Sequence, residues 1–135
     1  MVFRNDPILA PHDDGEWKLF ADLNYETSAG QVLTIPHGFI TDLASIPRVF
    51  HGLIPVNGKH RAAAIVHDYL YVTQIMSRAE SDRIFLEAME DLGVRWSQRW
   101  AMYSAVRIGG WLPWRKNTRA ITNDFQNHMK ANGLP

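Results

Sequence analysis

The residues with the clearest chemical potential are one histidine, two aspartates and one tyrosine near the middle of the chain. His67, Asp68 and Tyr71 interrupt a stretch that is otherwise apolar, and Asp82 lies in the next predicted helix. His67 and Tyr71 are four residues apart, so they share one face of a helix. If Asp82 accepts a hydrogen bond from one imidazole nitrogen, the tautomer is fixed and the other nitrogen becomes a base.

The chain between these residues predicts two antiparallel helices joined by a short connection. With the centre of the turn near residue 76, the depths of His67 and Asp82 differ by only about 4–5 Å at a rise of roughly 1.5 Å per residue. We therefore expect the imidazole and the Asp82 carboxylate to lie within hydrogen-bond reach. The pair would serve either as a catalytic dyad or as a satisfied polar pair that sets the register of two packed helices.

A second set of polar residues lies in the apolar loop that precedes these helices. Asp42 and Ser45 are three residues apart there, which is also the spacing of a local turn cap. They would either cap the turn or reach the His67 site, as a metal ligand or a hydrogen-bond donor. Ser45 as a nucleophile with His67 as its base is a weak alternative, because the sequence around Ser45 is no nucleophile elbow. The other histidines show no zinc-site spacing and are predicted to be surface or loop residues: His12, His37, His51, His60 and His128.

The stretch Ala63–Tyr71 resembles the active-site helix of the secreted phospholipase A2 superfamily, whose pattern is C-C-x-x-H-D-x-C-Y, and Ser81-Asp82-Arg83 falls at its C-D-R. The resemblance implies a hydrolase in which His67 activates water, Asp82 orients His67 and Tyr71 supports them. It also implies that Asp68 binds calcium. The cysteines of that pattern are replaced here and its glycine-rich calcium loop is not recognisable. We therefore expect no required cofactor and at most weak calcium binding, with Asp68 and Asp42 as candidate ligands.

A wider resemblance covers most of the chain. The run Ile35–Arg48 is similar to the signature of a small phage and prophage family catalogued as domain of unknown function 1353. The block Ala64–Tyr71, the helix that carries Asp82 and the block Ala101–Arg107 also fit that family. This resemblance implies a bacteriophage origin and no established activity.

The elements that must position these residues predict one α+β domain over residues 1–135, because strand patterns come first and helix patterns follow. We expect a small antiparallel sheet and an ordered loop, packed on an antiparallel helix hairpin and a third helix. Residues 1–56 would form the strands and the loop, 57–110 a three-helix core, and 111–135 a basic tail with a weak helical pattern. The expected elements are strands at 17–25 and 31–35, helices from 58 to about 73–76, 77–92, 95–108 and 118–130, and an aromatic turn at 111–114.

Local signals support several of these boundaries. Ser77 and Glu80 have the spacing of a helix capping box, and Gly93 is a helix stop signal. In the third predicted helix, Trp96 and Trp100 lie on a helical stripe and are expected in the core.

The composition narrows the classes of function. The chain has 135 residues, 46% of them apolar and none of them cysteine, which excludes global disorder, a disulfide scaffold and thiol catalysis. Residues 1–50 carry a net charge of −4, and residues 95–135 carry +6. This asymmetry either balances within the fold or faces an anionic partner. No apolar run approaches the roughly 18 residues of a membrane span, and no signal peptide is recognised.

These observations lead to one main interpretation and one alternative. The main interpretation is a bacteriophage accessory or virion-associated protein that binds a phage or host protein and carries a His-Asp polar site between two helices. The alternative is a phospholipase A2-like hydrolase. A membrane surface would be contacted through Trp111, Trp114, Arg115 and Lys116, and a nucleic-acid partner is not expected. The expected location is the host cytoplasm or the virion, without secretion by a signal peptide.

Overall fold

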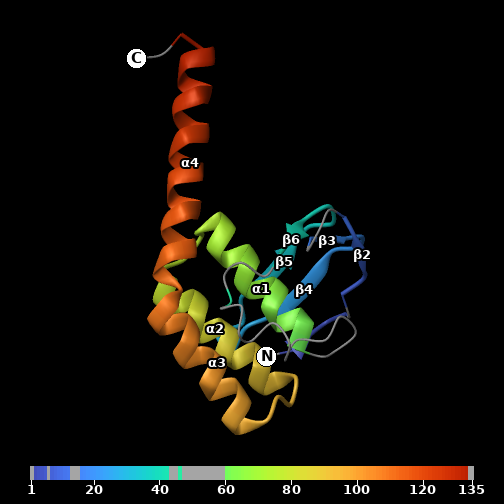
Figure 1. Ribbon diagram of the computed structural model, residues 1–135. Coiled ribbons are helices and arrows are strands. Elements are labelled where there is room, and N and C mark those ends of the chain that lie inside the picture. Colours follow the sequence, from blue (N-terminus) through green and yellow to red (C-terminus); the bar gives the residue numbers. More distant parts are fainter. Residues whose placement is uncertain (1, 6, 13–15, 43–45, 47–59, 134–135) are drawn as a thin grey trace.

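The computed structural model describes residues 2–5, 7–12, 16–42, 46 and 60–133. Within these ranges the fold is α+β as predicted, with two three-stranded antiparallel sheets and four helices (Figure 1). One sheet has the strand order β1-β4-β5 and the other β2-β3-β6. The strands are β1 Val2–Phe3, β2 Leu9–Pro11, β3 Trp17–Leu19, β4 Leu23–Glu26, β5 Val32–Ile35 and β6 Ile40–Thr41. The helices are α1 His60–Thr73, α2 Arg78–Asp91, α3 Trp96–Gly109 and α4 Trp111–Ala131.

The strand expected over residues 17–25 is wrong in one respect, because the chain turns in its middle and the two halves join different sheets. Asp22 lies at this corner, where its carboxylate accepts a hydrogen bond of 2.8 Å from the backbone N–H of His37. Asn5 donates to the carbonyl of Asp22 at 2.7 Å. These two bonds fix the turn of the chain at Asp22. The alternation of apolar and polar residues runs through the turn, so it does not mark where one strand ends and the next begins.

The strand expected at residues 31–35 is confirmed as β5, which forms a hairpin with the strand before it. β4 pairs with β5 in antiparallel register, with Glu26 opposite Val32, and Gly30 takes the left-handed conformation with φ +83° that favours glycine. After Pro36 the sequence predicts loop alone, but Ile40 and Thr41 pair with β3 as the short strand β6. A two-residue strand leaves no periodic pattern, so its partner strand alone defines it.

The expected helix hairpin of α1 and α2 is also confirmed. α1 packs small and branched apolar residues on both sides, and its end is followed by Gln74 in a left-handed conformation. Ser77 is the N-cap of α2, and its hydroxyl accepts a hydrogen bond of 3.2 Å from the backbone N–H of Glu80. Gly93 follows α2 with φ +75°, as the stop signal predicts.

Two expectations about the C-terminal third are wrong. Trp96 and Trp100 lie outside the core with 67% and 42% of their surface exposed, and α3 instead buries Met102 and Val106. The segment from Trp111 to Trp114 is no separate aromatic turn but the first turn of α4. Pro113 fits there because the first N–H groups of a helix have no intrahelical acceptor.

The helix α4 continues well beyond the rest of the molecule as a single arm (Figure 1). None of its residues is buried. The core lies instead between the strands and α1 and α2, with Leu23, Tyr25 and Ile35 from the first sheet and Phe85 and Met89 from α2. In the described part of the chain, no helix combines the length and apolarity that crossing a membrane requires.

Candidate polar site between three helices

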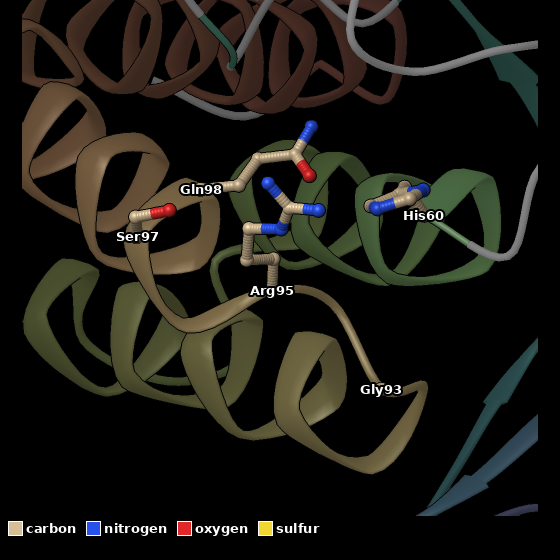
Figure 2. A pocket seen from close by; sticks show the side chains of 5 residues that line it. All are labelled: His60, Gly93, Arg95, Ser97 and Gln98. Carbon is tan, nitrogen blue, oxygen red and sulfur yellow. The ribbon is translucent and has the colours of Figure 1, made fainter.

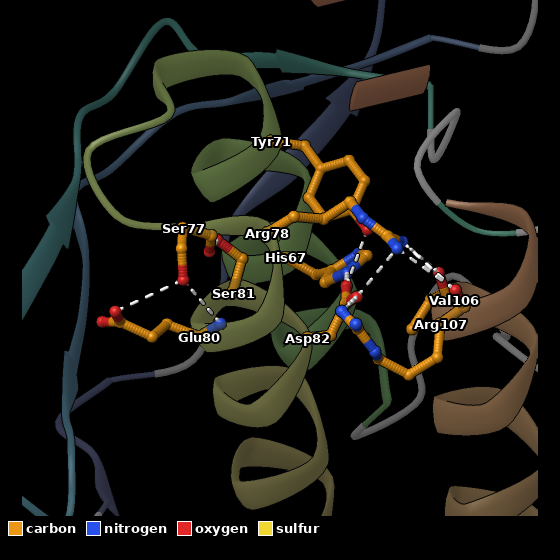
Figure 3. A network of polar contacts seen from close by, with 9 residues as sticks. All are labelled: His67, Tyr71, Ser77, Arg78, Glu80, Ser81, Asp82, Val106 and Arg107. Atoms are coloured by element: carbon orange, nitrogen blue, oxygen red, sulfur yellow. Dashed lines mark hydrogen bonds and ion pairs between the residues drawn. The ribbon is translucent and has the colours of Figure 1, made fainter. Parts of the chain in front are cut away.

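The predicted contact between His67 and Asp82 is present. The Nε2 atom of His67 in α1 lies 2.7 Å from Oδ1 of Asp82 in α2, and both side chains are fully buried, with 0% exposed surface (Figure 3). The matched depth of the two residues around the turn, read from the sequence, is what brings them together. Because an ionised carboxylate can only accept, Nε2 of His67 carries the proton that it donates to Asp82.

Asp82 is the centre of a larger network than the sequence indicated. Tyr71 donates its hydroxyl to the same Oδ1 atom at 2.7 Å. On the other side, Arg107 of α3 donates to Oδ2 at 2.8 Å, and Arg78 places its Nη1 atom 3.6 Å from Oδ2. One buried carboxylate therefore contacts four donors from three helices.

The network sets the ionisation of its members. Burial by itself would raise the pKa of Asp82, but hydrogen bonds from His67, Tyr71 and Arg107 outweigh it and lower that pKa below its ordinary value. Burial, followed by the neighbouring Asp82 carboxylate, raises the pKa of the Tyr71 hydroxyl. Asp82 is thus an anion and Tyr71 a neutral donor at neutral pH.

Apolar and backbone contacts enclose the network. The imidazole of His67 lies between the rings of Tyr71 and Phe85, with centroid separations of 4.3 and 4.5 Å. Trp114 of α4 packs edge-on against Tyr71 at 5.0 Å. Arg78 also donates to the carbonyls of Val106 at 3.1 Å and Arg107 at 3.3 Å (Figure 3), so it caps the C-terminal end of α3.

Gly110 completes the enclosure at the junction of α3 and α4. A Cβ atom at this position would collide with the Tyr71 hydroxyl and the Val106 carbonyl, and would lie 3.2 Å from Nη1 of Arg78. The backbone at Gly110 has an ordinary φ of −74°, so the requirement for glycine is steric. No side chain fits between the network and this backbone.

Sequence reasoning missed Arg78, Arg107 and Gly110. Arg78 lies four residues before Asp82, so helix spacing alone would have paired them. Arg107 lies seven residues after Trp100 in the sequence, so helix spacing places it near the stripe of Trp96 and Trp100, and an arginine close to an apolar stripe indicates a buried acidic partner. Nothing local in the sequence distinguishes Gly110 from Gly109.

Asp68 lies apart from this network. Its carboxylate accepts a short hydrogen bond from the Thr41 hydroxyl of β6, and 5% of its surface is exposed. Asp42 and Asp68 line the same hollow of about 230 Å³, together with Glu16, Tyr71 and Asn117. The structure therefore brings the two predicted metal-ligand candidates to one hollow. His67 and Asp82 do not line it.

The described side chains around this hollow do not by themselves form a metal-binding group. Carboxylate oxygens suit calcium, but such an ion takes six to eight oxygen ligands. Among the described residues, no group of three or more histidine, aspartate or glutamate side chains is arranged to hold a metal ion. One carboxylate oxygen of Asp68 is also engaged by Thr41.

The remaining candidates lie elsewhere. Ser45 and His51 fall outside the described residues. His12, His37 and His128 are on the surface as expected, and His37 pairs with Asp22 at 2.8 Å. His60 is half-buried in the first turn of α1.

A second hollow of about 650 Å³ opens beside the start of α3 (Figure 2). The residues that line it are His60, Gly93, Arg95, Ser97 and Gln98. None of these residues belongs to the Asp82 network, and none is acidic.

The sequence matches one family of known proteins. The family described as "Protein of unknown function (DUF1353)" matches residues 17–106 of the chain. The chain belongs to this family. The match includes Asp82 and three of its four donors, His67, Tyr71 and Arg78, and ends just before Arg107. As a DUF1353 protein, the chain inherits no activity from its family's description.

A curated protein is also similar to this chain. The chain is 30% identical over 112 residues to the uncharacterized protein y4jT of Sinorhizobium fredii (strain NBRC 101917 / NGR234). The alignment covers 82% of this chain and 33% of that relative, so the chain spans about a third of its relative's length. No solved structure matches.

Proposed function

We propose that this DUF1353 protein is a bacteriophage accessory or virion-associated protein that acts by binding another protein, and that the His67–Asp82 pair is a structural tie. The structural role of the His67–Asp82 pair rests on the environment of Asp82. Four donors from three helices contact its carboxylate, and neither Asp82 nor His67 has any exposed surface. A buried ion group satisfied in this way fixes how helices pack.

The charges in the network argue for the same role. Two guanidinium groups, from Arg78 and Arg107, already bring more positive charge than the single negative charge of Asp82, before His67 takes up a proton. A catalytic aspartate beside a histidine works by stabilising the imidazolium that forms. Here the arginines share that carboxylate, so less of its charge is available to His67.

The exposed arm α4 supports the binding role. It carries four basic residues and Asp124 as its one acid, a net charge of +3 with histidine neutral. Ile121 and Phe125 are four residues apart on one face, with 42% and 61% of their surface exposed. A basic helix with an unpaired apolar stripe suits a partner that presents an acidic, partly apolar groove. The phage origin rests on the resemblance of the sequence to phage proteins, and we propose with it that the partner is found in the host cytoplasm or the virion.

A crosslinking experiment in the producing host tests this role. A photo-crosslinking residue at Thr122, beside the apolar stripe, should give one discrete protein adduct in cells that express the phage genes. Phe125→Glu should abolish the adduct, whereas Gln126→Glu adds the same charge at the next position and should retain it. Absence of any adduct, or equal adducts from both variants, would contradict binding through α4.

The same arm also offers a membrane surface as an alternative partner, through Trp111, Trp114, Arg115 and Lys116. Trp111 is 53% exposed, which suits such a contact. Trp114 packs against Tyr71, so much of its ring serves the protein's own fold. The protein partner is therefore the better supported of the two.

The second candidate function is a hydrolase, favoured by one specific arrangement. His67 and Tyr71 both donate to Oδ1 of Asp82, which is the orientation that the phospholipase A2 resemblance implies. With Nε2–H held by Asp82, Nδ1 would take a proton from water as the water oxygen bonds to an ester carbonyl. That proton would then pass to the leaving alkoxide as the C–O bond breaks. Tyr71 and Asp68 line a nearby hollow that His67 itself does not line, so an ester held there would reach Nδ1 only if the hollow opened further.

An assay on a panel of phospholipid and simple ester substrates separates the two functions. The structural role predicts no hydrolysis by the wild-type protein. Hydrolysis by the wild type that falls by about 100-fold or more in folded His67→Gln would establish the hydrolase instead. Ser45 as a nucleophile would show as a loss of that activity in Ser45→Ala.

A further inference from the structure

The second hollow, beside the start of α3, is lined by polar side chains, and none of the described residues around it is acidic. It measures about 650 Å³, and its lining consists of His60, Gly93, Arg95, Ser97 and Gln98. Figure 2 shows the Arg95 guanidinium and the Gln98 amide turned toward the side on which the His60 ring lies. The volume falls in the range of small-molecule sites. A guanidinium and neutral donors without an acid indicate a ligand that carries negative charge.

Two helices begin at this hollow. His60 is the first residue of α1, and Ser97 and Gln98 lie in the first turn of α3. Neither helix has an acidic residue in its first turn. Because the start of a helix carries a partial positive charge, both helices favour an anion in the hollow.

The start of α3 also leaves backbone donors without an acceptor in the helix. No described side chain caps this end by a hydrogen bond. The first backbone hydrogen bond of α3 runs from the N–H of Arg99 to the carbonyl of Arg95 at 2.9 Å. The N–H groups of Ser97 and Gln98 precede it, so they point out of the end of the helix. N–H groups in this position are suited to bind the oxygens of an anion.

Two side chains at the hollow are not engaged by the protein itself. In the described part of the chain, no acid forms an ion pair with Arg95, whereas Arg99 donates to the carbonyl of Val94 at 3.1 Å. The Nδ1 atom of His60 is buried, yet it has no hydrogen-bond partner among the described residues. A buried polar atom is normally paired, so an unpaired one at the wall of a hollow indicates a partner from outside the chain.

We infer that this hollow binds the phosphate group of a small polar molecule, such as a sugar phosphate. A phosphate monoester presents three terminal oxygens, so it accepts hydrogen bonds from several directions at once. The planar fork of Arg95 suits two of these oxygens, and the N–H groups at the start of α3 suit the third. His60 would donate from the side of α1 after a small rotation of its ring. A carboxylate has only two oxygens in one plane and would leave some of these donors unused.

The rest of the lining decides what the phosphate is attached to. Ser97 and Gln98 offer a hydroxyl and an amide, and Gly93 offers only its backbone. None of the described residues around the hollow has an apolar side chain, so a hydroxyl-bearing group fits there better than an alkyl or aromatic one. The hollow is separate from α4 and from the Asp82 network, so this inference goes beyond the proposed function.

Titration of the nitrogen-15-labelled chain with ribose 5-phosphate, followed by NMR, tests the inference. We expect saturable binding with a dissociation constant at or below about 1 mM at low salt, and the largest shifts at the amides of Ser97 and Gln98. Arg95→Gln should weaken binding at least about 10-fold, because a charge-assisted contact is lost. Arg83→Gln removes the same charge from an exposed position of α2 and should bind like the wild type. No saturation up to about 20 mM, or equal weakening by both variants, would overturn the inference.

Ser97→Asp provides a second variant, one that preserves the fold. An aspartate in the first turn interacts favourably with the helix dipole, so the melting temperature should not fall. The same carboxylate would repel a phosphate in the hollow, so binding should weaken about 10-fold or more. Ser104→Asp is the matched control at an exposed position of α3, roughly 10 Å further along the helix, and should bind within about 3-fold of the wild type. Undiminished binding by Ser97→Asp would overturn the inference.

Three further probes identify the source of the phosphate group. Inorganic phosphate should bind more weakly than ribose 5-phosphate, because it leaves most of the hollow empty, and acetate should bind more weakly still. Phosphatidylcholine vesicles that contain phosphatidic acid should not retain the protein through Arg95. Acetate that binds as tightly as ribose 5-phosphate would overturn the preference for phosphate. Vesicle retention that Arg95→Gln abolishes, without binding of ribose 5-phosphate, would overturn the inference in favour of a lipid headgroup.

Discussion

At the scale of single residues, Asp82 decides how the centre of the molecule is built. Its carboxylate is fully buried, and it is stable there only because His67, Tyr71, Arg78 and Arg107 surround it. A buried charge that loses its partners costs far more than the same charge on the surface. Each residue of the network therefore depends on the others, and removal of one leaves the rest unsatisfied.

The lowered pKa of Asp82 predicts an acid-sensitive fold. A carboxyl group whose pKa is lower in the folded state contributes stability that is complete above the unfolded value of about 3.9 and is lost as the pH falls toward the folded value. The urea midpoint of the wild type should therefore fall between about pH 5 and pH 2.5. In Asp82→Asn this fall should be smaller.

Comparing the urea midpoints of the wild type and Asp82→Asn isolates the contribution of Asp82 to acid sensitivity. Burial raises the pKa of Asp91, which has the opposite effect on acid stability but is present in both proteins. Parallel pH profiles for wild type and Asp82→Asn would show that Asp82 is not the group responsible.

Gly110 provides a steric test of the enclosure around the network. Gly110→Ala should destabilise the fold by about 1–3 kcal/mol, because its Cβ would displace the Tyr71 hydroxyl and Arg78. Gly109→Ala is the matched control, since a Cβ there meets no atom within 4 Å. That control should be neutral or stabilising by up to about 1 kcal/mol, as for glycine to alanine in a helix. Equal effects of the two substitutions in chemical unfolding would contradict the packing described here.

We expect Asp68 to bind calcium or magnesium weakly, if at all. Calorimetric titration with calcium and with magnesium should show no binding below about millimolar concentration, because the described residues provide too few oxygen ligands. The melting temperature should also remain unchanged by millimolar calcium in both the wild type and Asp68→Asn. Tight binding that Asp68→Asn removes would show that the hollow of Asp42 and Asp68 is a calcium site.

At the scale of elements, the helix hairpin of α1 and α2 was predictable from the sequence, whereas the orientation of α3 and the strand β6 were not. The boundaries of α1 and α2 depend on local signals, such as the Ser77 cap and Gly93, and these are present in the sequence itself. The exposure of Trp96 and Trp100 was not predictable, because a helical stripe does not indicate which side of the helix meets the core. β6 exists only through its pairing with β3, so no local pattern could reveal it.

The candidate site followed the same division. The contact of His67 with Asp82 could be predicted because both residues lie on adjacent helices at matched depth. The contribution of Arg107 depends on how α3 packs against α2, which is a long-range feature. The helix expected at residues 118–130 begins earlier, at Trp111, because the segment 111–114, expected as an aromatic turn, forms the first turn of α4.

Because α4 has no buried residue, we expect most of its length to be dispensable for folding. Its hydrogen bonds with the residue after α1 lie near its start, where Gln74 donates to the carbonyl of Trp114 at 2.8 Å and Thr118 donates to Gln74 at 3.0 Å. Removal of residues 121–135 should leave the unfolding free energy within about 0.5 kcal/mol of the full chain. Trp114→Ala should lower it more, through its lost contact with Tyr71. A truncated protein that unfolds much more easily would mean that the arm stabilises the body.

At the scale of the whole molecule, the charge asymmetry of the sequence persists in the fold. Among the described residues, Arg107 is the one base after residue 94 that forms an ion pair, with Asp82. The bases of α4 lie on a helix that extends away from the acidic N-terminal half (Figure 1). The charges therefore do not balance simply by contact, and α4 keeps a positive potential for an anionic partner.

The most direct test of this account measures folding and hydrolysis on the same samples of wild type, His67→Gln and His67→Ala. If the His67–Asp82 pair is a structural tie, His67→Ala should lose about 1–3 kcal/mol of unfolding free energy, because Asp82 loses a buried partner. His67→Gln should lose less, and none of the three proteins should hydrolyse the ester panel. A wild type with clear hydrolysis that is abolished in a fully stable His67→Gln would contradict the account and identify His67 as a catalytic base.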